Sequence, residues 1–249
     1  MLFHNREHDR ALAFIKGSGF DIFCLQEVPK EFLVQLASLP YHLAEAVDGD
    51  RVFGRVIRNH LVILSRYPII STGTISWEDY WPTFRLRTKL FTYLMRLSHW
   101  SKVMNRNGLY ADLEVGGTPL RVFNLHTALT HPDHRLREFE EAMAKRDPCR
   151  PTIVCGDFNT IESPRVSLLN WLLGGSPADA ILYRRERTRI EEHFVAHELS
   201  NPLRGNVTHS FAASQLDHIL VSNSFSIKSA TVLPDRFGSD HHPIQVDIS

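Results

Sequence analysis

Ser239-Asp240-His241-His242-Pro243, close to the end of the chain, is the most informative stretch of the sequence. It places a carboxylate and two imidazoles directly before an apolar segment, Ile244–Ile248, that is typical of a strand. Such groups are costly to bury unless they are paired, hydrogen-bonded or bound to a metal. Their position at the end of a strand therefore predicts one side of a polar cleft.

Three further polar segments extend this pattern upstream. They are Leu25-Gln26-Glu27, Gly156-Asp157-Phe158-Asn159 and Gln215-Leu216-Asp217-His218-Ile219. Each borders a short apolar run that is typical of a buried strand: Ile22–Leu25, Thr152–Cys155 and Ile219–Ser222. Because a sheet gathers the ends of its strands around one edge, we expect the four segments to form a single site.

In these motifs the chain resembles the endonuclease/exonuclease/phosphatase superfamily, in the family's order and from about residue 21 to the C-terminus. The matching residues are Glu27 in LQE, His126 in NLH, Asp157 and Asn159 in GDFN, Asp217 in QLDHI, and Asp240-His241 in SDHHP. The resemblance implies one α/β domain over residues 1–249, a four-layered sandwich of two packed, mainly antiparallel β-sheets flanked by helices. It also implies a divalent-metal-dependent hydrolase of phosphate esters.

One element of the family pattern is missing. In the family, a strand ending in an Asn precedes the first helix, and that Asn helps to hold the metal-site Glu. Here the helix is expected over residues 6–17, and Asn5 follows no apolar strand. We therefore expect a chain that starts late and lacks the first strand, with unpaired backbone groups on a neighbouring strand that favour dimerisation or poor solubility.

The carboxylates predict a metal site. Hydroxide attack on an anionic phosphate ester requires charge neutralisation, which a hard cation bound by carboxylates provides. Mg²⁺ typically binds through one or two carboxylates and keeps several waters. By resemblance, Mg²⁺ or Mn²⁺ is held mainly by Glu27, with contributions from Asp240 and Asp157. The alternative for Glu27 is a charge at the N-terminus of a helix that follows Pro29.

Asp157 and Asn159 are spaced two apart, so in an extended segment their side chains face the same way. The resemblance implies that Asp157 orients or deprotonates the attacking water and that Asn159 donates to a phosphoryl oxygen of the substrate. The alternative is an Asx-rich turn leaving a strand, where Gly, Asp and Asn are common for backbone reasons.

Two histidines complete the predicted catalytic set. His241 is the candidate for stabilising the transition state, and the resemblance implies Asp217 as the carboxylate that orients its ring and raises its pKa. His126 would contact the phosphate or protonate the leaving group, with Asn124 bracing it and contacting substrate. The alternative for His126 is a satisfied core histidine.

Residues 77–107 form the segment where the family varies most, and here it is basic and aromatic. No Asp or Glu occurs from Pro82 to Ala111, and Leu86, Leu90 and Leu94 recur at helical spacing. We consider an amphipathic helix packed on the domain, a lid that grips a nucleic acid, and a helix that touches anionic lipid. The basic and aromatic residues favour nucleic acid, with Arg106 as a substrate-binding residue.

Composition is consistent with one soluble domain. The 249 residues are 43% hydrophobic and 22% charged, enough for a sizeable core. Lys+Arg and Asp+Glu both number 28, so net charge does not steer the chain toward nucleic acid or membrane. The three cysteines predict reduced thiols, and the start is too polar for a signal peptide, so we expect a cytoplasmic protein without stable membrane insertion.

These observations predict a metal-dependent phosphoesterase, with a nuclease-like phosphodiesterase acting on nucleic acid favoured. The alternatives are a lipid or inositol-phosphate phosphoesterase of the same family, and a non-catalytic or truncated binding member.

Overall fold

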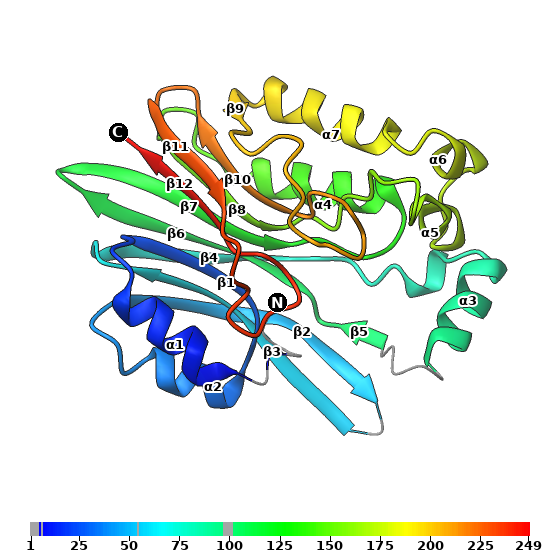
Figure 1. Ribbon diagram of the computed structural model, residues 1–249, viewed down its shortest axis with the longest axis horizontal. Helices are drawn as coiled ribbons and strands as arrows, with labels where there is room; N and C mark the ends of the chain where they lie inside the picture. Colours follow the sequence, from blue (N-terminus) through cyan, green and yellow to red (C-terminus); the bar gives the residue numbers. More distant parts are fainter. Residues whose placement is uncertain (1–4, 6, 54, 97–101) are drawn as a thin grey trace.

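In the computed structural model, two β-sheets pack face to face and helices cover their outer faces (Figure 1). The structure describes residue 5 and residues 7–53, 55–96 and 102–249. The predicted α/β architecture of packed, mainly antiparallel sheets flanked by helices is confirmed. The expected absence of a first strand concerns the start of the chain, where residues 1–4 and 6 lie outside the described part.

Within the described residues, the first sheet has four strands and the second has six. The first has the order β1-β3-β2-β5 and comprises β1 (Ile22–Pro29), β2 (His42–Phe53), β3 (Arg55–Ser65) and β5 (Lys102–Met104). The second has the order β4-β6-β7-β8-β10-β9 and comprises β4 (Ile69–Ser76), β6 (Asn107–Val115), β7 (Thr118–His126), β8 (Thr152–Asp157), β9 (Leu199–Ser200) and β10 (Asp217–Ser222). β7 and β8 run parallel, and the other described pairs are antiparallel, including a separate ribbon of β11 (Ile227–Val232) and β12 (Ile244–Ile248).

The helices fall into three groups (Figure 1). α1 (His8–Gly17) and α2 (Lys30–Leu36) cover the first sheet, and α4 (Pro132–Met143) and α7 (Arg185–Ala196) cover the second. α3 (Leu86–Arg96), α5 (Ser167–Leu172) and α6 (Pro177–Ile181) gather at one end of the molecule, near the short 3-10 helix η1 (Trp81–Thr83). Among the described helices, none is long and apolar enough to cross a membrane.

β3 illustrates how strand alternation builds the two cores on either side of the first sheet. Val62 and Leu64 pack with Phe32 of α2 on the outer face, whereas Leu61 and Ile63 face the second sheet. Successive side chains of a strand point to opposite faces, so a strand buried on both faces is a continuous apolar run in the sequence. Leu61–Leu64 is such a run, and it lies in β3.

The register of three neighbouring strands brings distant polar residues together. β7 pairs His126 with Asp157 of β8, and β10 pairs Asp217 with the same Asp157. Directly opposite residues on neighbouring strands lie close enough for their side chains to interact. Asp157 therefore stands between His126 and Asp217 at one end of the second sheet.

Candidate active site

Two β-bulges in the first sheet position a pair of acids. The pairing with β3 is irregular at Glu27 in β1 and at Asp48 in β2. Bulges bend a strand locally and re-aim its side chains, and Glu27 has a positive φ of 55°. The backbone N–H of Glu27 donates to Asp48 Oδ2 at 2.9 Å, so the two acids are held together across β3.

Glu27 offers an oxygen that suits a cation. Its side chain is 1% exposed, and Oε1 accepts a hydrogen bond from Arg51. Oε2 is buried without a hydrogen-bond partner among the described residues. Because an unsatisfied buried carboxylate oxygen is costly, this atom fits a divalent cation, which would satisfy it.

His126 and Asp48 form one Asp–His pair. His126 Nδ1 lies 3.0 Å from both carboxylate oxygens of Asp48. Burial alone would lower the pKa of His126, but the charge and hydrogen bond of Asp48, with the charge of Asp157, raise that pKa to about 9. The ring is therefore an imidazolium at neutral pH, and its Nε2 lies 3.8 Å from Asp157 Oδ2.

His241 and Asp217 form a second pair, as the resemblance implied. His241 Nδ1 donates to Asp217 Oδ2 at 2.7 Å. Burial alone would raise the pKa of Asp217, but the positive charge and hydrogen bond of His241 lower it to about 2. Burial likewise opposes protonation of His241, yet the charge and hydrogen bond of Asp217 raise its pKa. The imidazolium form is the favoured one.

Asp157 lies between these two pairs and is fully buried. Burial raises the pKa of its carboxyl to about 6, with Asp217 adding to the rise while the charges of His241 and His126 oppose it. Oδ1 accepts from the backbone N–H of Asn159 at 2.8 Å, and Oδ2 has no hydrogen-bond partner in the described part of the chain. A carboxylate with this pKa can take up a proton near neutral pH.

The segment after Asp157 turns instead of extending, which corrects the expectation drawn from the two-residue spacing. Asn159 has a positive φ of 51°, and the bond from its N–H to Asp157 closes the Asx turn considered as the alternative. Its Nδ2 donates to Thr127 O at 2.8 Å while the residue lines the cleft. The turn and the placement in the candidate site thus coexist.

The predicted metal ligands are not gathered into one cluster. Two triads of described residues have ligand atoms that all lie within 4.8 Å of one another: Asp157–Asp217–His241 and His209–Asp240–His241. Glu27 belongs to neither, so the set of Glu27, Asp240 and Asp157 is divided. Glu27 and Asp240 both line the cleft, and a Mg²⁺ ion that keeps most of its waters needs one or two carboxylates at most.

Asn124 is not placed to contact substrate or to brace His126. It is fully buried, and its Nδ2 donates to Leu25 O and Val62 O at 2.9 and 3.0 Å. Its Oδ1 accepts from Gln26 Nε2 at 2.6 Å. Asn124 therefore ties the second sheet to the first, and the brace of His126 is Asp48.

Arg106 lines the cleft, but its guanidinium is largely used within the protein. It forms a two-point ion pair with Glu138 at 2.6 and 3.1 Å and donates to His126 O at 2.6 Å. A bidentate pair of this kind is strong and directional. Arg106 therefore holds the end of β7 in place, and its predicted contact with substrate stays a prediction.

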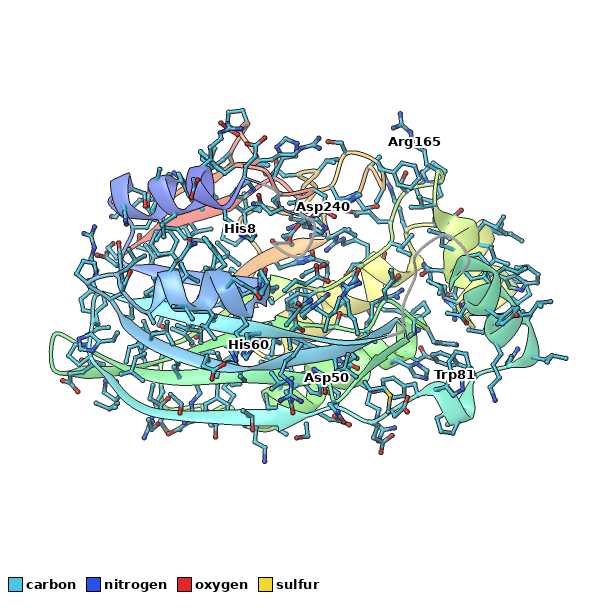
Figure 2. The ribbon with its side chains drawn as sticks, turned by 90° about the horizontal axis from the view of Figure 1, so that it is seen from below. His8, Asp50, His60, Trp81, Arg165 and Asp240 are labelled. Atoms are coloured by element: carbon cyan, nitrogen blue, oxygen red, sulfur yellow. The ribbon has the colours of Figure 1, made fainter. Side chains whose placement is uncertain are left out.

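The cleft itself has a volume of about 580 Å³ and joins the polar residues to an aromatic wall. Its polar lining includes Glu27, Asp48, His126, Asn159, Asp240 and His241. Its aromatic lining comprises Trp77, Tyr80, Trp81, Phe84 and Phe211. In Figure 2, Asp240 lies toward the middle of the molecule and Trp81 at the end formed by α3 and α5.

His209 is a cleft residue that the sequence motifs did not mark. Its ring centroid lies 4.7 Å from that of His241, and its Nδ1 accepts from the backbone N–H of Ala212 at 3.1 Å. The proton of the neutral ring is therefore on Nε2. Burial, and then the charge of His241, lower the pKa of His209, so this ring is a neutral donor. A cation on Nε2 would move the proton to Nδ1, against the Ala212 N–H.

Asp48 was missed as well. It lies in a segment, Val47-Asp48-Gly49, whose Asp-Gly pair inside a strand is a recognisable sign of a bulge. Nothing local indicated its partner, because His126 is 78 residues further along the chain.

Comparison with known proteins gives a family and a fold. The model of the Endonuclease/Exonuclease/phosphatase family matches residues 4–241. No curated protein matches the chain.

Solved structures with a similar fold are diverged in sequence. An endonuclease/exonuclease/phosphatase from Beutenbergia cavernae DSM 12333 is 16% identical with a TM-score of 0.70, and the alignment covers 97% of this chain and 65% of that one. Humanized D. rerio TDP2 is 14% identical with a TM-score of 0.59, covering 98% and 91%. The mannosyl-6-phosphatase Bt3783 of Bacteroides thetaiotaomicron VPI-5482 is 18% identical with a TM-score of 0.58, covering 98% and 91%. At these identities the likeness shows the fold alone.

Proposed function

Because this chain belongs to the endonuclease/exonuclease/phosphatase family, we propose that it is a divalent-metal-dependent hydrolase that cleaves phosphodiesters. The observation that carries the proposal is the position of Asp157 between the His126–Asp48 and His241–Asp217 pairs. A carboxylate that can take a proton, flanked by two imidazolium groups, suits attack by water on an anionic phosphorus centre.

The residues present fit a divalent cation. Glu27 supplies a buried, unsatisfied carboxylate oxygen, and Asp240 lines the same cleft. Mg²⁺ or Mn²⁺ bound there would neutralise charge on the phosphate and polarise its oxygens.

The remaining roles belong to His126, Asn159, His209 and His241, which line the cleft, and to Asp157 and Asp217, which lie beside them. Asp157 accepts the proton of the attacking water, and the imidazolium of His241 donates to a phosphoryl oxygen while Asp217 keeps the ring protonated. His126 supplies a proton to the leaving oxygen, since its pKa of about 9 keeps it charged at neutral pH. Asn159 and His209, which both line the cleft, donate further hydrogen bonds to the phosphoryl group.

Nucleic acid as the substrate stays a prediction from the basic and aromatic segment. The aromatic wall of the cleft supports it, because bases stack on such side chains. Arg87 and Arg106 support it less, since both guanidinium groups bind protein acceptors. The Bacteroides structure is that of a mannosyl-6-phosphatase, which adds a phosphate monoester to the substrates worth testing.

The test is hydrolysis of bis(p-nitrophenyl) phosphate and p-nitrophenyl phosphate with Mg²⁺ or Mn²⁺, against EDTA. We expect metal-dependent cleavage of the diester and a loss of about 10³-fold or more in Asp157→Asn. Asp112→Asn is the matched control, because Asp112 is similarly buried but pairs with Arg121 and Arg150 away from the cleft. Turnover that persists in EDTA, or an Asp157→Asn variant as active as Asp112→Asn, would contradict the proposal.

A further inference from the structure

Helix α3 exposes the apolar side that a packed amphipathic helix would bury. Leu86 is 83% exposed, Leu90 57%, Tyr93 60% and Leu94 53%. These residues are spaced at i, i+4, i+7 and i+8, so they form one stripe along the helix. The first interpretation of this segment, an apolar face packed on the domain, is therefore wrong for the described residues of α3.

The opposite side of α3 is its attachment. Thr88 is fully buried, and the Arg87 guanidinium donates to Trp171 O at 3.1 Å and to Gly175 O. The same guanidinium lies 4.7 Å from the Trp171 ring, a cation–π contact. Polar and cationic contacts to α5 thus fix α3 with its leucines outward.

The exposed stripe continues over neighbouring elements. α5 and α6, at the same end of the molecule (Figure 1), expose Leu168, Ile181 and Leu182 by more than half. Phe211, 78% exposed, and Leu129 add apolar side chains where the cleft opens. Several exposed apolar side chains gathered at one end of a domain favour an interaction site.

The charged residues of α3, α5 and α6, and of the segments that adjoin them, are mainly basic. Arg85 precedes α3, Arg165 precedes α5, and Arg184 and Arg185 follow α6; all four are exposed, and Figure 2 shows Arg165 projecting from the molecule. Residues 82–96 contain no acid, and the one acid in residues 163–185, Asp179, is buried, accepts from Ser176 and lies 3.6 Å from Arg185. A face of leucines edged by arginines complements a surface that is apolar below and anionic on top.

We propose that this face, formed by α3, α5, α6 and Phe211, docks onto an anionic lipid surface with the cleft opening toward the headgroups. Leu86, Leu90 and Leu94 would enter the boundary between headgroups and acyl chains, and the arginines would pair with anionic headgroups. The phosphates on the outer surface of a nucleic acid would leave these leucines in water, because a charged phosphate offers them no apolar contact. The docking is independent of the proposed activity. The further step, that a lipid phosphodiester is the substrate, rests on the proposed function.

Co-sedimentation with vesicles tests the docking without turnover. The probes are vesicles of phosphatidylcholine alone and of phosphatidylcholine with 30% phosphatidylserine, at low and high salt. We expect binding to the anionic vesicles that weakens with salt, and a loss of at least 10-fold in the double variant Leu86→Asp/Leu90→Asp.

The matched control is Val34→Asp/Val195→Asp, because these valines are 66% and 72% exposed on α2 and α7, away from the face. Circular dichroism and thermal unfolding check that all variants fold. The double variant Arg85→Gln/Arg165→Gln should bind anionic vesicles more weakly but keep the apolar contribution of the leucines. Its binding to vesicles should therefore depend less on salt.

Three results would overturn the proposal. The first is wild-type protein that stays in the supernatant with both vesicle types, and the second is equal binding by the leucine and valine variants. The third is loss of self-association or of single-stranded oligonucleotide binding in the leucine variant without any vesicle binding, which would assign the face to a second copy or to nucleic acid. An inactive protein would still sediment with vesicles, so failure of the proposed function appears separately in the p-nitrophenyl assay.

Discussion

His209 and His241 show how neighbouring imidazoles receive different protonation states. His241 faces the carboxylate of Asp217, which raises its pKa, whereas His209 faces the backbone N–H of Ala212 and feels the charge of His241. The surroundings therefore favour the cationic form of His241 and the neutral form of His209. A phosphoryl oxygen between them would be contacted by both without the repulsion of two adjacent cations.

Two substitutions of His209 test separately the donor Nε2 and the acceptor Nδ1, which binds the Ala212 N–H. His209→Asn keeps an acceptor near the Nδ1 position for the Ala212 N–H but removes the donor at Nε2. His209→Gln keeps a donor near the Nε2 position but removes the acceptor for Ala212. We expect the Asn variant to unfold at the wild-type temperature with kcat/KM for the diester lowered on the order of 10²-fold, and the Gln variant to retain more activity. A higher Mg²⁺ requirement in the Asn variant would instead indicate a metal ligand.

The His126–Asp48 pair makes stability depend on pH. The folded pKa of His126, about 9, lies above its ordinary value of 6.5, so the pair stabilises the fold fully below pH 6.5 and loses this effect as pH rises through 9. We expect the free energy of unfolding in urea, measured in EDTA, to fall by at most about 3 kcal/mol between pH 6 and 9.5. Asp48→Asn should flatten this slope, and an unchanged slope would show that another group titrates.

At the scale of elements, β7 and β8 depend on one glycine. Gly156 has a φ of 145°, and a Cβ added there would lie 1.8 Å from Leu125 O in the adjacent parallel strand. The close approach lets β8 run beside β7 up to the paired residues His126 and Asp157. The glycine of the GDFN motif is thus required by the backbone that positions the site.

Gly156→Ala should therefore lower the free energy of unfolding by more than the cost of backbone strain alone. Backbone strain at a positive φ costs about 1–3 kcal/mol, and here the Cβ also collides with backbone that cannot move without breaking the strand pair. Gly117→Ala is the matched control, since its φ is 84° and nothing lies within 4 Å of the added Cβ. Similar urea midpoints for the two variants would show that β7 moves aside easily.

The elements that were predictable are those that carry their own local pattern. Leu61–Leu64 is a continuous apolar run, and Gly116-Gly117 forms the two-residue turn, with positive φ at both glycines, between the strands β6 and β7. The role of Asp48 was not predictable, because it depends on His126, which is 78 residues further along the chain. The side of α3 that packs on the domain was not predictable either. Periodicity finds the leucine stripe, but the contacts of Arg87 and Thr88 decide which side is buried.

At the scale of the whole molecule, the two sheets leave a second cavity on the side of the N-terminal helix. Its volume is about 560 Å³, and it is lined by β1, β12 and the apolar face of α1. Among the described strands, β1 pairs with β3 alone and β12 with β11 alone. Two strand edges therefore border an apolar space, an arrangement that favours association with another extended segment.

Hydrogen exchange measures whether these edges are covered in solution. If the chain is monomeric, the cavity-facing amides of β1 and β12 should exchange faster, by orders of magnitude, than the amides of Leu61–Leu64 and Thr152–Cys155, which lie in strands paired on both sides. Sedimentation at the same protein concentration supplies the oligomeric state. Strong protection of β1 and β12 that disappears on dilution, together with a dimeric mass, would show that a second copy pairs with these edges. Equal protection in a monomer would contradict the exposed-edge interpretation, because the backbone groups of β1 and β12 would then have to be satisfied from within the same chain.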